Sequence, residues 1–185
     1  MTGPKRGITM SSSVIVEFDM RIKKGEFERD DLELIDGATS FCGLTTPSRP
    51  FTSRINGDCG AVDITFARVP NAVEATIDVI ISEVQSEFSL SLSSFVYIGG
   101  SHQEIQLFCG IIRDESCGLR RRYVIAVELD TWIHLNFKVG QKGSKYDDLE
   151  SYCDFKANLH GNACEQIMLE HASISLKVTW SPLPV

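Results

Sequence analysis

The N-terminal part of the chain alternates between apolar and polar residues. Residues 14–23 read VIVEFDMRIK, and their apolar side chains fall on one face of an extended chain: Val14, Val16, Phe18, Met20 and Ile22. After Ile15, the opposite face is charged: Glu17, Asp19, Arg21 and Lys23. Because successive side chains of a strand point to opposite sides, this pattern predicts a β-strand with one buried face and one solvated face.

The same period of two recurs through most of the chain. It predicts further strands over residues 61–69, 88–95, 104–112, 122–129, 133–139, 152–157, 165–171 and 173–180. Residues 72–84, AVEATIDVIISEV, fit a helical period as well as an alternating one. Their many β-branched side chains would lose rotamer freedom in a helix, so we predict a strand there too.

Glycine and asparagine residues punctuate the chain between these segments. Examples are Gly37, Asn56-Gly57, Gly99-Gly100 and Gly161-Asn162. Turn residues at such short intervals are typical of β-hairpins. About ten two-faced strands need a second layer to cover their apolar sides. The sequence therefore predicts an all-β protein, an antiparallel β-sandwich of two sheets or a flattened barrel, with little helix.

The length of the chain suits one domain. Its 185 residues contain neither a linker nor an internal repeat, so we expect a single β-sandwich domain over residues 1–185. No apolar run reaches the ~20 residues of a membrane-spanning helix, and no signal peptide is visible, which predicts a cytoplasmic protein without membrane contact. The six cysteines are scattered along the chain, so reduced thiols are expected.

The charge of the chain bears on its partners. A net charge of −7 at pH 7 repels phosphate backbones, so no nucleic-acid binding is predicted. Arg120, Arg121 and Arg122 are the candidate basic patch, and they directly precede the apolar segment YVIAV. We interpret them as a solvated turn at the start of a strand, with contact to a phosphate or an acidic partner as the alternative.

Two sets of residues resemble metal-binding patterns. Ca²⁺ prefers about six to eight oxygen ligands, and loop aspartates could supply four of them: Asp30, Asp31, Asp147 and Asp148. A C-x6-H-x3-C-x6-H array is formed by Cys153, His160, Cys164 and His171. Structural zinc sites usually pair ligands about two to four positions apart, and only His160 and Cys164 meet that spacing. We interpret both sets as ordinary turn and strand residues, and we predict no metal or other cofactor.

No motif for nucleophilic catalysis is recognisable in this sequence. There is no G-x-S-x-G elbow, and the four isolated histidines do not define a triad: His102, His134, His160 and His171. His134 is predicted on the polar face of its strand, exposed to solvent. Gly99-Gly100 is a turn dipeptide and not a phosphate-binding loop. The sequence therefore nominates no catalytic, cofactor-binding or metal-binding residue, and we expect that the protein is not an enzyme.

Several stretches carry a resemblance that spans nearly the whole chain. They are LIDGATSF, RINGDCGAVDITFARVPNAVEATIDVIISEVQ, FSLSLSSF, LDTWIHLNFKVGQ and ASISLKVTW, together with the opening TGPKRGI. Together they resemble an uncharacterised domain family of grass and cereal proteins, described as a domain of unknown function. Its members occur alone or joined to the jasmonate-induced ribosome-inactivating proteins of cereals, which are rRNA N-glycosidases. The resemblance implies a setting in plant stress or defence.

The resemblance does not carry the glycosidase activity over. That active site needs a glutamate and an arginine on one helix, and the segment VEATID around Glu74 has no arginine one turn later. Relatives also begin with a further apolar and aromatic segment before the TGP motif, which implies that this chain lacks N-terminal residues present in relatives. Such a loss would leave a sheet edge open to self-association or to a partner strand.

These observations lead to one main expectation about function. We expect a non-catalytic interaction or accessory module of a plant stress- or defence-associated family, which contacts a protein partner or itself through a sheet edge. The alternative is a carbohydrate- or calcium-binding β-sandwich that uses loop residues such as Trp132, Tyr146 and the aspartate pairs. A third hypothesis is an activity associated with rRNA N-glycosidases.

Overall fold

The computed structural model of the chain describes residues 9–10, 12–27, 30–43, 46–57, 60–113, 119–141, 149–170 and 172–183. These residues form twelve β-strands and no α-helix, which confirms the predicted all-β class. In the described part of the chain, no helix is long and apolar enough to cross a membrane. The backbone divides into two compact units, Thr9–Arg68 and Val69–Pro184. The expectation of one domain over residues 1–185 stays a prediction.

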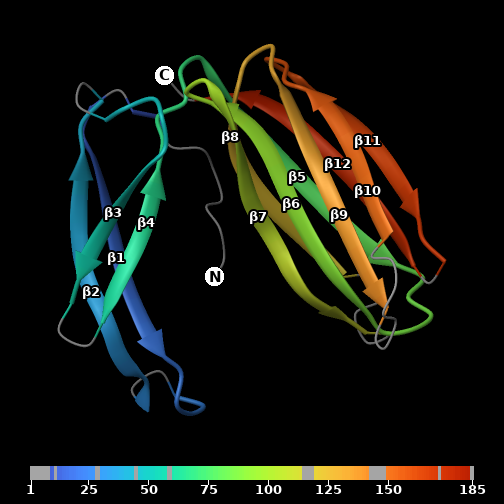
Figure 1. Ribbon diagram of the computed structural model, residues 1–185, viewed down its shortest axis with the longest axis horizontal. Helices are drawn as coiled ribbons and strands as arrows, with labels where there is room; N and C mark the ends of the chain where they lie inside the picture. Colours follow the sequence, from blue (N-terminus) through green and yellow to red (C-terminus); the bar gives the residue numbers. More distant parts are fainter. Residues whose placement is uncertain are drawn as a thin grey trace. The chain divides into compact units, whose positions relative to one another are not determined.

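The unit Val69–Pro184 is built from two four-stranded antiparallel sheets (Figure 1). Its strands are β5 (Ala72–Ser82), β6 (Phe88–Ile98), β7 (Ser101–Ile112), β8 (Leu119–Glu128), β9 (Trp132–Gln141), β10 (Leu149–Lys156), β11 (Gly161–Met168) and β12 (Ser173–Pro182). One sheet has the order β10-β9-β6-β7 and the other has the order β11-β12-β5-β8. Neither sheet closes on itself, so the arrangement is the predicted sandwich and not the barrel.

The core of this unit lies between the two sheets. Alternate residues of β6 point inward, and Phe88, Leu90 and Leu92 are at most 2% exposed. From the other sheet, Val79 and Ile81 of β5 line the same small apolar cavity of about 10 Å³ as Leu90 and Leu92. The two apolar faces therefore cover each other, which is the main stabilising contribution expected for two-faced strands.

The segment with two possible periods is a strand. In β5 the residues Val73, Ala75 and Ile77 are at most 1% exposed, and they alternate with outward-facing residues such as Thr76 and Asp78. The strand pairs with β12 on one side and with β8 on the other. A central strand needs a buried inner face along its whole length, and the β-branched residues of this segment supply it.

The unit Thr9–Arg68 contains two hairpins. They are formed by β1 (Val14–Ile22) with β2 (Leu32–Phe41) and by β3 (Phe51–Asn56) with β4 (Ala61–Phe66). The ring centroid of Phe66 lies 4.0 Å from that of Phe41 and 5.9 Å from that of Phe51, so these rings join the two hairpins. The predicted apolar side of β1 is only half-buried, and its alternation holds as far as Met20. Ile22 is 51% exposed, because the register shifts between Met20 and Arg21.

Strands β2 and β3 were not predicted. Gly37 was assigned to a turn, but it lies in the middle of β2, directly opposite Phe18 of β1. A Cβ atom at Gly37 would lie 3.1 Å from the ring of Phe18, so this glycine makes room for an aromatic side chain across the strand pair. Strand β3 is six residues long, too short for its alternation to stand out. The prediction of Gly99-Gly100 as a turn is confirmed, with φ angles of 59° and 94°.

Candidate functional site

Aromatic side chains gather on the outer face of the sheet β10-β9-β6-β7. Because Val96 and Ile133 point into the core, their neighbours Tyr97 and Trp132 point outward. These outward rings are unusually accessible, with exposed fractions of 37% for Tyr97, 48% for Trp132 and 60% for Tyr152. We use the name aromatic face for six residues: Phe95, Tyr97, His102, Trp132, His134 and Tyr152.

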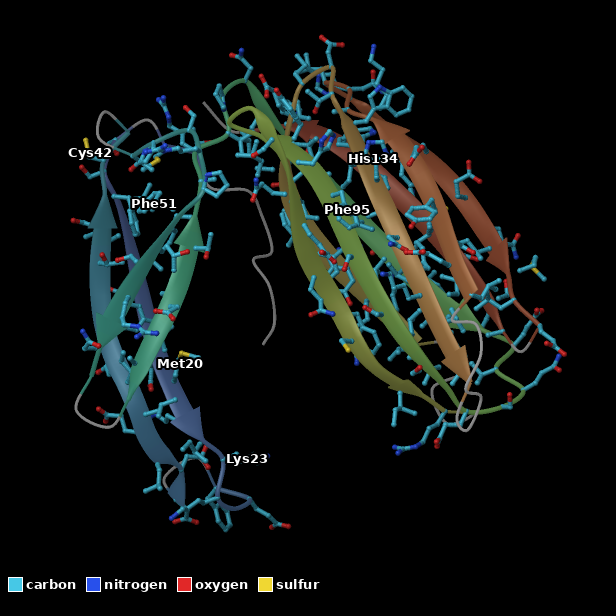
Figure 2. The ribbon with its side chains drawn as sticks, viewed as in Figure 1. Met20, Lys23, Cys42, Phe51, Phe95 and His134 are labelled. Atoms are coloured by element: carbon cyan, nitrogen blue, oxygen red, sulfur yellow. The ribbon has the colours of Figure 1, made fainter. Side chains whose placement is uncertain are left out.

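The strand register brings these rings side by side. Phe95 of β6 is directly opposite His134 of β9, and Figure 2 labels both residues on their neighbouring strands. The ring of His102 on β7 lies 5.5 Å from that of Tyr97 and 6.1 Å from that of His134. An open depression of about 400 Å³ lies here, lined by Phe95, His102, His134, Asn136, Tyr152 and Asp154. A flat ligand in this depression would contact rings from several strands at once.

The side chain of His134 is less exposed to solvent than the sequence predicts. It lies on the polar face of its strand as expected, but only 34% of its side chain is exposed. Its Nδ1 atom lies 2.7 Å from Oδ1 of Asp154 on the adjacent strand β10. This contact fixes the orientation of the imidazole ring at the wall of the depression.

A polar network lies beside the rings. Asn136 is 4% exposed, and its amide nitrogen donates a hydrogen bond of 2.7 Å to Glu150. Hydrogen bonds from the hydroxyl of Tyr152 and from Asn136 lower the pKa of Glu150, and Lys138 lies 3.3 Å away from its carboxylate. The hydrogen bond to Glu150 raises the pKa of Tyr152. The Oδ1 atom of Asn136 is buried and has no hydrogen-bond partner among the described residues.

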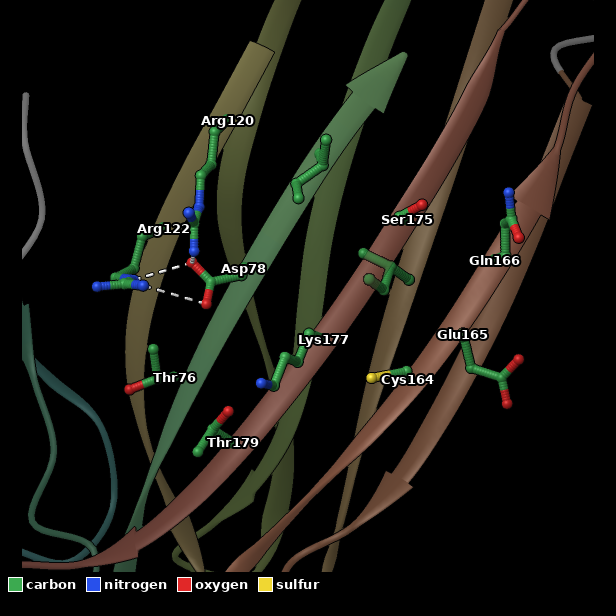
Figure 3. A pocket seen from close by; sticks show the side chains of 12 residues that line it. Thr76, Asp78, Arg120, Arg122, Cys164, Glu165, Gln166, Ser175, Lys177 and Thr179 are labelled. Carbon is green, nitrogen blue, oxygen red and sulfur yellow. Dashed lines mark hydrogen bonds and ion pairs between the residues drawn. The ribbon is translucent and has the colours of Figure 1, made fainter. Parts of the chain in front are cut away.

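The outer face of the other sheet carries a charged groove (Figure 3). The groove has a volume of about 660 Å³ and lies over strands β5, β8, β11 and β12. We use the name charged groove for six of its polar lining residues: Thr76, Asp78, Arg120, Arg122, Lys177 and Thr179. The two outer faces of the sandwich are thus chemically different, one rich in rings and the other rich in charge.

Asp78 organises the cations of the charged groove. The Nε and Nη2 atoms of Arg122 donate hydrogen bonds of 2.9 and 3.2 Å to its two carboxylate oxygens, and Arg120 adds a contact of 3.4 Å. The hydrogen bond from Arg122 holds the pKa of Asp78 below its usual range, and the same bond raises the pKa of Arg122. The carboxylate of Asp78 is therefore ionised at neutral pH and holds both guanidinium groups in place.

The predicted turn at Arg120, Arg121 and Arg122 is wrong, because all three residues lie within strand β8. Strand alternation then separates them: Arg120 and Arg122 face the charged groove, opposite Ile80 and Asp78 of β5. Arg121 is opposite Val79, whose side chain points to the core, and it lines the small apolar cavity between the sheets. The basic run therefore supplies two cations to one face and not three.

The zinc-type pattern noted in the sequence is not assembled in the described residues. Cys153 is opposite the buried Leu135, and burial raises the pKa of its thiol. Cys164 is opposite Lys177 in the other sheet, and His160 lies in the turn before β11. His171 lies outside the described residues. Among the residues that the structure describes, no group of three or more His, Cys, Asp or Glu side chains could hold a metal ion.

The calcium-type pattern is only partly visible. Asp30 and Asp31 lie between β1 and β2, and Asp31 accepts a hydrogen bond of 3.1 Å from the backbone N–H of Lys24. Asp147, Asp148 and Tyr146 lie outside the described residues. Trp132 is the first residue of β9 and not a loop residue.

The segment around Glu74 is a strand. Glu74 is 6% exposed, and the hydroxyls of Thr76 and Ser181 donate hydrogen bonds of 3.4 Å to its carboxylate. A glutamate on a β-strand cannot share one helix face with an arginine, which is the arrangement that the resemblance associates with N-glycosidases. This position therefore does not reproduce that active site.

The model of one protein family matches residues 1–178, nearly the whole chain. The chain belongs to the DUF6598 family. DUF6598 is described as a domain of unknown function, so the expected membership of such a family is confirmed. No curated protein and no solved structure matches the DUF6598 chain. The distribution of the family among grasses and its fusion to ribosome-inactivating proteins stay predictions.

Sequence reasoning named Trp132 but did not find the aromatic face as a unit. A signal was present in FSLSLSSFVYI, where Phe95 and Tyr97 interrupt a polar face otherwise made of serines. Assembly of the face, however, depends on which strands of the DUF6598 chain are neighbours. That information comes from the pairing of β6 with β7 and β9, which alternation along one strand does not contain.

Proposed function

We propose that the DUF6598 chain is a non-catalytic binding module that holds a carbohydrate on its aromatic face. The observation that carries this proposal is the exposure of Tyr97, Trp132 and Tyr152 on one face of a sheet. Solubility favours charged side chains there, and a gathering of exposed rings is typical of a binding surface. The C–H faces of sugar rings pack against aromatic rings, while sugar hydroxyls hydrogen-bond to polar groups around them.

The polar groups of the depression support a sugar as the ligand. Asp154 lines it with a side chain that is 54% exposed, and its carboxylate oxygens accept hydrogen bonds from hydroxyls. The carboxylates of Glu104, Glu150 and Asp154 belong to the same outer face, since each lies in register with an outward-facing residue. Glu150 is paired with Lys138, so Glu104 and Asp154 are the carboxylates that disfavour an acidic sugar by like-charge repulsion. A neutral β-linked glucan fits best, because its hydroxyls are equatorial and both faces of each ring present C–H groups.

Trp132 is expected to make the largest single contribution to the free energy of carbohydrate binding. A tryptophan side chain buries roughly 250 Å² when covered fully, and about half of this area is free on Trp132, which is 48% exposed. Covering about 120 Å² at ~25 cal/mol per Å² contributes up to about 3 kcal/mol. Ordering costs reduce the gain, so loss of this ring is expected to weaken binding roughly tenfold to a hundredfold.

Binding to immobilised glycans, followed by calorimetry with cellohexaose as the soluble probe, tests the proposal. The wild-type chain is compared with Trp132→Ala and Tyr97→Ala, which should weaken binding while the circular dichroism spectrum stays that of a β-protein. Phe27→Ala is the matched control, because Phe27 is an equally accessible ring, 59% exposed, in the other unit. Failure of the wild-type chain to bind any neutral glycan, or equal binding by all variants, would contradict the proposal.

The non-catalytic part of the proposal has its own test. The purified chain is incubated with ribosomes and, separately, with glycans, and released adenine and shortened oligosaccharides are measured. We expect neither released adenine nor shortened oligosaccharides. Turnover that co-purifies with the chain and is lost with its unfolding would show that the module is an enzyme.

A protein partner or self-association through a sheet edge is the second candidate function. Strand β7 lies at the edge of its sheet, is twelve residues long, and carries Ile111 with an exposed fraction of 52%. Long edge strands with exposed apolar residues pair readily with further strands. Light scattering after size-exclusion chromatography should then show a dimer for the wild-type chain and a monomer for Ile111→Lys. A monomeric wild-type chain would contradict self-association.

The biological setting is proposed from the family resemblance. We propose that the module acts in the cytoplasm as an accessory part of plant stress- or defence-associated proteins, including those joined to ribosome-inactivating domains. Transcript measurements in cereal leaves treated with jasmonate should show induction. Absence of induction under jasmonate, wounding and infection would contradict this setting and would leave the carbohydrate proposal unaffected.

A further inference from the structure

We propose that the charged groove is a second binding site, which takes a small molecule or lipid headgroup that carries phosphate groups. This site lies on the sheet β11-β12-β5-β8, whereas the aromatic face belongs to the other sheet, so the inference does not rest on the proposed carbohydrate function.

The cations of the groove are already oriented. Arg122 uses two of its nitrogens for Asp78, and this fork holds the guanidinium plane in one direction. The side chains of Arg122 and Arg120 are nevertheless 57% and 61% exposed, so their remaining N–H donors face solvent. A guanidinium held on one side by a carboxylate loses little further freedom when a phosphate oxygen binds on the other side.

Lys177 adds a third cation from the neighbouring strand β12. It lies directly opposite Asp78 in the strand register, and in Figure 3 its side chain extends toward β5, the strand of Asp78. Among the described residues, Lys177 forms no salt bridge within 4.0 Å. Its ammonium group is therefore available to an anion that also reaches Arg122.

The groove keeps an excess of positive charge although the whole chain is acidic. Three cations, Arg120, Arg122 and Lys177, lie on the same outer face of the sheet as the carboxylate of Asp78. Glu165 also borders the groove, but it is opposite the inward-facing Leu176, so alternation places it on the other side of the sheet, and Figure 3 shows its carboxylate pointing away from Lys177. Because the whole chain carries a net charge of −7, this local excess favours a compact anion over an extended one.

The other lining groups and the size of the groove also suit phosphate. Thr179 lies two positions after Lys177 on β12, and its hydroxyl can donate to a phosphate oxygen. The volume of about 660 Å³ lies within the roughly 300–1,000 Å³ of small-molecule sites. It is large enough for a sugar or cyclitol ring with more than one phosphate group.

Calorimetric titration with inositol hexakisphosphate, and separately with inorganic phosphate, tests this inference. The key variant is Arg120→Gln combined with Lys177→Gln, which removes two cations and leaves the pair of Arg122 with Asp78 intact. Each lost charge-assisted contact should weaken binding about tenfold, so the double variant should bind roughly a hundredfold more weakly. Arg113→Gln combined with Lys156→Gln is the charge-matched control, since neither residue lines the groove, and it should bind like the wild-type chain.

A second arm separates the two sources of phosphate. Flotation with phosphatidylcholine vesicles, with and without phosphatidylinositol bisphosphate, reports on a lipid headgroup. Groove-dependent binding of the soluble probe alone identifies a free phosphorylated molecule, and groove-dependent binding to the phosphoinositide vesicles identifies a headgroup. Either result supports the site. No binding by the wild-type chain in both arms, or equal weakening by the control pair, would overturn it.

Discussion

Replacement of Asp78 by asparagine tests how the charged groove is held together. The substitution keeps the shape of the side chain but removes its charge and one acceptor for Arg122. Asp78 is 8% exposed and receives three guanidinium contacts of 2.9, 3.2 and 3.4 Å. Hydrogen bonds to a charged group that is shielded from water contribute about 1.5–3 kcal/mol each. The guanidinium groups here are exposed and screened by water, so we expect Asp78→Asn to lower the free energy of unfolding by about 1–2 kcal/mol in total.

The pH dependence of this loss follows from the pKa of Asp78. Arg122 lowers this pKa in the folded chain, so Asp78 contributes stability that is present above the pKa of an unfolded aspartate, about 3.9, and is lost as the pH falls through the folded value. Urea unfolding should therefore show that Asp78→Asn is less stable than the wild-type chain by the same free energy at pH 7 and at about pH 5. Below the pKa of the unfolded aspartate, this difference in the free energy of unfolding should shrink.

Asp130→Asn provides the control for this experiment. Asp130 lies 3.6 Å from Lys156 in the same unit, but its side chain is 77% exposed, so its loss should leave the unfolding midpoint unchanged. The reasoning is refuted if Asp78→Asn is as stable as the wild-type chain at pH 7. It is refuted equally if the deficit persists undiminished at acid pH, or if a carbon NMR titration of the wild-type carboxyl gives an unshifted pKa.

Three further predictions concern packing and reactivity. Phe137→Ala should cost about 3–5 kcal/mol in urea unfolding, because Phe137 is fully buried in β9; a cost as small as that of a surface change would contradict the sandwich core. Gly57→Ala should destabilise the unit Thr9–Arg68 by about 1–3 kcal/mol, because its new Cβ would lie 2.8 Å from Cγ1 of the buried Ile35; unchanged thermal unfolding would show that Ile35 has room to move. Maleimide should modify the exposed Cys164 before Cys153, whose thiol pKa is raised by burial, and mass spectrometry of the first modified peptide decides the order.

Much of the fold follows from local pattern. Alternation predicts β1 and the eight strands of the sandwich because each of them must present one apolar face to a core. It fails at β2, where Gly37 looks like a turn until the ring of Phe18 is placed across the strand pair. The residues around a glycine in the sequence do not show that it makes room for a side chain on another strand.

The candidate sites were harder to predict for a related reason. The run Arg120, Arg121 and Arg122 looked like one basic patch, but the strand alternates, so Arg121 leaves the face that the other two share. Lys177 joins them from β12, more than fifty positions away in the sequence, because β5 lies between β8 and β12. Both the charged groove and the aromatic face are products of strand order, which is a property of the whole sheet.

We propose that the outer face of β10-β9-β6-β7 holds a carbohydrate. Backbone amide NMR shifts of the isotopically labelled chain, recorded during titration with cellohexaose, test it most directly. We expect saturable shifts at Phe95, His134 and Asn136 and none along β5 and β12. An unchanged spectrum, or shifts confined to the opposite sheet, would contradict it.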